Sequence, residues 1–153
     1  MEIIFTCLIA IIVVGILYTV VHRTMMKRAT TMMRSHAQAV TDDAVNACLY
    51  EMLSWDKTLD SELVADVWGK GVLAFEYQFA VEDRPNLTRE NLESALDRYA
   101  KDHKLDTANG SPATFVITDW WQYEKIQHID VAYLLNEATK EYIDDLRCLD
   151  KAK

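Results

Sequence analysis

The sequence is poor in the residues that usually separate domains. It holds four glycines and two prolines in 153 residues. No linker rich in Pro, Gly or Ser interrupts the chain, and neither does an internal repeat or a low-complexity tract. A division into several folded domains is therefore disfavoured. The length that follows the first 40 residues suits one domain with its own core.

Cysteine is also scarce. The chain has three, Cys7, Cys48 and Cys148, and none of them has the CxxC spacing of a zinc site or a redox motif. Isolated cysteines of this kind are typical of buried, unreactive thiols in a reducing compartment. We therefore expect neither a disulfide framework nor a metal bound by thiolates.

Motifs that carry catalytic chemistry are missing as well. No serine lies in the GxSxG pattern of a nucleophile elbow. Gly69-Lys70-Gly71 does not fit a phosphate-binding loop, because Val64 replaces the first glycine and Gly71 the hydroxyl residue. Glu124 and His128 are four residues apart, unlike the Glu-x-x-His motif of di-metal bundles, and we interpret them as a solvated pair. We expect no enzyme activity, no cofactor and no metal.

One stretch lacks charge altogether. From Ile3 to Val21, nineteen residues include no charged side chain, no proline and no amide side chain. As a helix they rise about 28 Å, close to the roughly 30 Å thickness of membrane hydrocarbon. A cleaved signal peptide is disfavoured because no cation precedes the run and Val20-Val21-His22 is a poor cleavage site. We expect residues 1–22 to form a single-pass signal-anchor helix.

Basic residues follow this anchor directly, and no acid occurs between them and Asp42. Positive charges beside a span remain in the cytoplasm, which predicts an external N-terminus and a cytoplasmic C-terminal part at the cell (inner) membrane. We expect residues 23–40 to form a basic juxtamembrane helix, and a stalk packed on the domain is an alternative. Four cations, which we call the collar, are expected to contact lipid headgroups at the membrane surface: Arg23, Lys27, Arg28 and Arg34.

One pattern opposes this topology. Asn86-Leu87-Thr88 and Asn109-Gly110-Ser111 match the N-glycosylation pattern, which is used only on the luminal side. Such triplets often arise by chance, and Pro112 disfavours use of the second. We therefore give the collar more weight.

The rest of the chain, residues 41–153, is acidic. It carries 12 basic and 23 acidic residues, a net charge of −11. A domain of this charge repels nucleic acid and anionic lipid, which disfavours a role in binding DNA or RNA. A basic or neutral protein partner suits it better.

Hydrophobic spacing in residues 41–153 predicts a mainly α-helical domain, with four or five helices around one core and at most one minimal strand pair. Residues 72–81 fit both the alternation of a strand and the stripe of a helix. We interpret them as a helix because no clear partner strand lies next to them. Apolar residues recur at helical spacing in four further stretches: Thr41–Trp55, Ser61–Trp68, Thr88–His103 and Val131–Leu149.

The most informative feature outside the anchor is the aromatic cluster of Trp120, Trp121 and Tyr123. Asp119 and Gln122 have the spacing of a capping box, which predicts a helix through both tryptophans. Adjacent residues on a helix point about 100° apart, so two neighbouring tryptophans are hard to bury together. Core packing is one interpretation. A second is a partner-binding site, since exposed Trp and Tyr favour interfaces. A membrane-interface anchor is a third, and the acidic Asp119 and Glu124 nearby disfavour it.

Together these features predict a membrane-anchored adaptor or accessory protein. Its acidic helical domain would bind a protein partner at the cytoplasmic membrane face. A small bacterial or phage immunity or exclusion protein is an alternative, and an enzyme with an unrecognised site is another. Self-association through Gly15-x-x-x-Thr19 in the anchor has only weak support.

Overall fold

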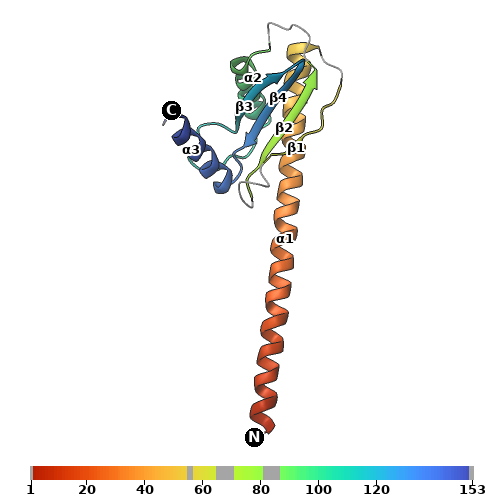
Figure 1. Cartoon of the computed structure of the whole chain (residues 1–153), viewed down its shortest axis with the longest axis vertical. Coiled ribbons are helices and arrows are strands. Elements are labelled where there is room, and N and C mark those ends of the chain that lie inside the picture. The colour runs from red at the N-terminus through yellow and green to blue at the C-terminus, as the bar shows by residue number, and fades with distance from the viewer. Residues whose placement is uncertain (1, 55–56, 65–70, 81–86, 152–153) are drawn as a thin grey trace. The chain divides into compact units, whose positions relative to one another are not determined.

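The computed structural model describes residues 2–54, 57–64, 71–80 and 87–151. The chain divides into two compact units, Met1–Ser35 and His36–Lys153. Seven elements follow one another (Figure 1): α1 (Glu2–Leu53), β1 (Glu62–Leu63), β2 (Ala74–Ala80), α2 (Arg89–Asp102), β3 (Phe115–Tyr123), β4 (Ile126–Tyr133) and α3 (Glu137–Lys151).

Helix α1 is continuous from the apolar stretch into the second unit. Its N-terminal part is long and apolar enough to cross a membrane. No new helix starts at Thr41, which lies inside α1 and whose buried hydroxyl donates to the carbonyl oxygen of Ala37 at 2.7 Å, one turn earlier. Such a bond satisfies the hydroxyl inside a helix and leaves the backbone ladder intact.

The expectation of a mainly helical domain with a minimal strand pair is wrong. A four-stranded antiparallel sheet runs in the order β1-β2-β4-β3 (Figure 1). The ambiguous residues 72–81 contain β2, and the strand alternation in them is the correct signal. Their main partner is β4, which lies some 50 residues further on, so no partner was visible nearby in the sequence.

The two tryptophans also lie in this sheet and not in a helix. Strands β3 and β4 form a hairpin in which Tyr123 pairs with Ile126. The turn residue Glu124 has a φ of 56°.

The last helix begins later than predicted, because Asn136 caps it by accepting the backbone N–H of Thr139 at 2.9 Å.

Two other predicted helices have different outcomes. The helix predicted at Thr88–His103 is confirmed as α2, whose cap Thr88 accepts the backbone N–H of Asn91 at 3.2 Å. The helix predicted from Ser61 is wrong at Glu62–Leu63, which form β1. Residues 65–70 of that prediction lie outside the described residues.

The sheet separates two apolar layers. On the inner face, Phe75, Tyr77 and Phe79 pack into the main core with α2 and the C-terminal part of α1. On the outer face, α3 packs through Ile143 in a smaller cluster with Ala74 and Ala132. Figure 1 shows α3 beside the end of the sheet where β4 finishes, away from the β3–β4 hairpin.

Tyr77 links the sheet to α1 and provides a test of this arrangement. Its ring is fully buried, and its hydroxyl donates to Oδ1 of Asp42 at 2.7 Å. Burial, followed by the bond to Asp42, raises the pKa of Tyr77 far above its usual range, so the hydroxyl remains a donor.

We expect Tyr77→Phe to lower the free energy of unfolding by about 1–3 kcal/mol, since it leaves the Asp42 carboxylate without this donor. Urea denaturation of the full chain in mild detergent measures the change. Tyr50→Phe is the control, because Tyr50 is 63% exposed. Equal effects of the two changes would contradict the buried bond.

Candidate functional site

Helix α3 covers one end of the outer face of the sheet. The helix packs over the end of the sheet that contains Ala74 and Ala132. Towards the β3–β4 hairpin, the outward-pointing residues have no helix over them among the described residues. We call this area the open face, and its residues are Glu76, Gln78, Asp119, Trp121, Tyr123, Ile126, His128 and Asp130.

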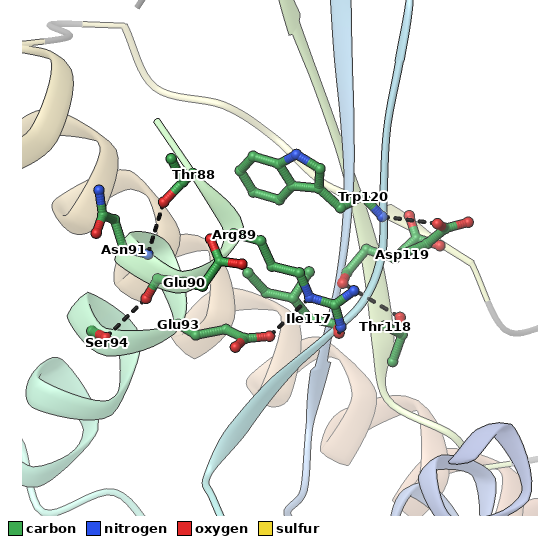
Figure 2. A network of polar contacts seen from close by, with 11 residues as sticks. Thr88, Arg89, Glu90, Asn91, Glu93, Ser94, Ile117, Thr118, Asp119 and Trp120 are labelled. Atoms are coloured by element: carbon green, nitrogen blue, oxygen red, sulfur yellow. Dashed lines mark hydrogen bonds and ion pairs between the residues drawn. The ribbon is translucent and has the colours of Figure 1, made fainter. Parts of the chain in front are cut away.

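A β-bulge decides which tryptophan reaches the open face. The β3–β4 register shifts between Ile117 and Asp119, which adds one residue to β3. Because side chains alternate along a strand, this extra residue moves Trp120 to the core side and Trp121 to the outer side. Trp120 is half-buried against the main core, whereas Trp121 is 42% exposed. Figure 2 shows the Trp120 indole pointing from β3 towards the α2 side.

Trp121 is held in place by its cross-strand neighbour. Its ring stacks on His128, with centroids 3.6 Å apart and planes 7° from parallel. His128 Nδ1 donates to Oε1 of Glu76 at 2.8 Å, as an ionised carboxylate only accepts. Gln78 donates to the same oxygen at 3.0 Å. Three strands therefore fix one indole, with one ring face against the imidazole.

Three carboxylates form a row across the same face. Asp130 of β4 is paired in register with Glu76 of β2 on one side and with Asp119 of β3 on the other. Burial first, and then the charges of Glu76 and Asp119, raise the pKa of Asp130 to about 6, although His128 lowers it. Tyr142 of α3 lies beside this row. Burial, and then the charges of Asp130 and Asp119, raise the pKa of Tyr142.

The edges of the sheet are less available than its face. At β3, Arg89 of α2 donates from Nη2 to the carbonyl of Ile117 and pairs with Glu93 at 3.0 Å (Figure 2). The backbone N–H of Trp120 donates to Oδ1 of Asp119 at 2.8 Å. Side chains thus occupy backbone groups that a further strand would need, and a bulge also discourages strand addition.

The opposite edge is held by α1. Gln38 donates to the carbonyl of Ser61 at 2.8 Å, next to β1. The amide of Asn46 both donates to and accepts from the backbone of Leu59, at 2.9 and 2.8 Å. These contacts make the open face, and not an edge, the candidate for binding.

The predicted site residues fall into separate groups. Trp121 and Tyr123 share the open face, where Tyr123 is 63% exposed, but Trp120 does not. The collar lies on α1 in the other unit, with Arg23, Lys27 and Arg28 exposed and Arg34 half-buried.

Part of the open face was not predicted from the sequence. His128 pairs with Glu76 on a neighbouring strand, while Glu124 is a turn residue, so the predicted Glu124–His128 pair is wrong. The alternation of polar His128 and Asp130 with apolar Ile129 and Val131 is the signal that could have found it. In the described part of the chain, no group of three or more His, Cys, Asp and Glu side chains could hold a metal ion.

Comparison with known proteins identifies no relative of this chain. No protein-family model matches the chain, and no curated protein or solved structure shows significant similarity to it.

The carboxylate row predicts an unusual dependence of stability on pH. The pKa of Asp130 is about 6 in the folded chain against an ordinary 3.8, so between these values the fold binds more protons than the unfolded chain. Protonated Asp130 makes its full contribution to the free energy of unfolding below about pH 4, and this contribution is lost as the pH rises through about 6.

We therefore expect Asp130→Asn to raise the free energy of unfolding at pH 8 by about 1 kcal/mol, allowing for solvent screening of a half-exposed group. At pH 4 the two chains should be equally stable. Urea titrations at both pH values measure this, with Asp145→Asn on the exposed side of α3 as the control. A loss of stability of Asp130→Asn at pH 8 would contradict the unfavourable burial and repulsion of the Asp130 carboxylate.

Proposed function

We propose that this chain is a single-pass, membrane-anchored adaptor or accessory protein that binds a protein partner through the open face. The observation that carries the proposal is the group of Trp121, Tyr123 and Ile126 beside the hairpin, which are 42%, 63% and 41% exposed. Exposed aromatic residues on a rigid scaffold are the usual anchors of protein interfaces.

The rigidity of the surface supports this function. Trp121 is stacked on His128, and Glu76 holds His128 in turn, so little side-chain freedom is lost when a partner covers the indole. The carboxylate row around the aromatic residues disfavours anionic lipid as the binding partner, because like charges repel. A protein surface is the partner that suits both features.

Helix α1 supports the membrane location. It is long and apolar enough to span the bilayer, and the collar follows the apolar part on the same helix. Under the positive-inside rule we propose that the N-terminus lies outside and the folded domain lies in the cytoplasm. The open face would then be presented to cytoplasmic proteins or to cytoplasmic parts of membrane proteins.

Cysteine labelling tests this topology without added sequence. Cys148 is exposed, whereas Cys48 is buried and burial raises its pKa to about 11, which suppresses its reaction. We expect a membrane-impermeant maleimide to label Cys148 only after the cells are permeabilised. Cys148→Ser should remove that label. Labelling of Cys148 in intact cells would show that the orientation is reversed.

Site-specific photocrosslinking in cells tests the binding surface. A benzoylphenylalanine in place of Tyr123 should form a protein adduct, because partner atoms lie within reach of its ring. The same residue in place of Tyr50 should form none. The control is matched, since Tyr50 and Tyr123 are each 63% exposed. Adducts at both positions, or adducts with lipid alone at position 123, would contradict the proposal.

A further inference from the structure

The carboxylate row on the open face has His128 as a basic neighbour, but the residues of the open face include no lysine or arginine. Glu76 accepts bonds from His128 and Gln78, and Asp119 accepts the backbone N–H of Trp120. Asp130 is half-buried, is paired in register between the other two acids, and has His128 two residues away on the same face of β4. A half-buried carboxylate between two other carboxylates is unfavourable, and a cation placed over the row would relieve the repulsion.

An aromatic platform lies next to this row. Trp121 and Asp119 point outward from the same strand two residues apart, so they are about 7 Å from each other along β3. One ring face of Trp121 is against His128, and its 42% exposure leaves indole surface open to solvent. A guanidinium stacked on that surface would reach the carboxylates.

We propose that the open face recognises a cationic segment of a protein partner, with arginine on Trp121 and the carboxylate row and with apolar side chains on Tyr123 and Ile126. This inference rests on the proposed function and names the chemistry of its partner. Arginine suits the site better than lysine, because a planar guanidinium both stacks on an aromatic ring and bonds to carboxylates.

Charge complementarity favours this occupant over others. A second copy of the chain docked through the same face would bring two carboxylate rows together, which is repulsive. An anionic membrane surface would meet the same repulsion. A metal ion is disfavoured because these carboxylates and His128 do not converge on one point in the described structure.

Peptide binding to the full chain in nanodiscs of zwitterionic lipid tests the inference. The probes are fluorescent peptides in which two arginines alternate with leucines, and matched peptides with lysine, glutamine or glutamate at those positions. We expect the arginine peptide to bind at least ten times more tightly than the glutamine and glutamate peptides, and more tightly than the lysine peptide. Raising the salt concentration should weaken its binding.

Two double variants distinguish an effect of the open face from an effect of the overall negative charge. Glu76→Gln with Asp119→Asn keeps the acceptor oxygens and removes two negative charges, and it should weaken binding of the arginine peptide at least tenfold. Asp144→Asn with Asp145→Asn makes the same charge change on exposed positions of α3 and should have little effect. Trp121→Leu should also weaken binding, and circular dichroism should show that all variants keep their secondary structure.

Several outcomes would overturn the inference: equal binding of the arginine and glutamine peptides, equal losses in both double variants, or no binding by any peptide. These results are distinct from failure of the proposed function. A protein adduct at position 123 without discrimination among peptides would overturn only the cationic partner. Discrimination among peptides without any protein adduct in cells would overturn the adaptor function alone.

Discussion

The pairing of β2 with β4 is the constraint on which the folded unit depends. Seven residues of β2 pair with seven of β4, and each strand also has a second neighbour, β1 or β3. Because side chains alternate across this central pair, one face receives Phe75, Tyr77 and Phe79 for the core. The other face receives Glu76, His128 and Asp130. The same register therefore builds the core and the open face.

The parts of the fold visible in the sequence are those set by local signals. The apolar stretch and the capped helix α2 both depend on residues within a few turns of each other, and both predictions agree with the structure. The sheet depends on contacts between distant segments, which no single window contains. Glu124 in the hairpin turn adds to the difficulty, since such turns usually carry Asn or Gly at positions of positive φ.

The candidate site was predictable only in part. Trp121 and Tyr123 of the aromatic cluster lie on the open face, but the geometry expected for the cluster was that of a helix. Without the bulge after Ile117, strand alternation would place Trp120 outward and Trp121 in the core. The row of Glu76, Asp119 and Asp130 comes from three strands, and no spacing in the sequence relates these residues. In the structure Trp121 lies on the open face, whereas Trp120 packs against the main core.

The distance in sequence between β2 and β4 has a consequence for the folding of the chain during its synthesis. Forty-six positions separate the C-terminal end of β2, Ala80, from its partner Ile126. At about 5–20 residues per second, β2 waits roughly 2–9 s before its partner strand is made. During that interval Phe75, Tyr77 and Phe79 have neither their pairing with β4 nor their complete core. An aromatic strand without its partner is prone to aggregation, so premature association competes with folding until β4 has been made.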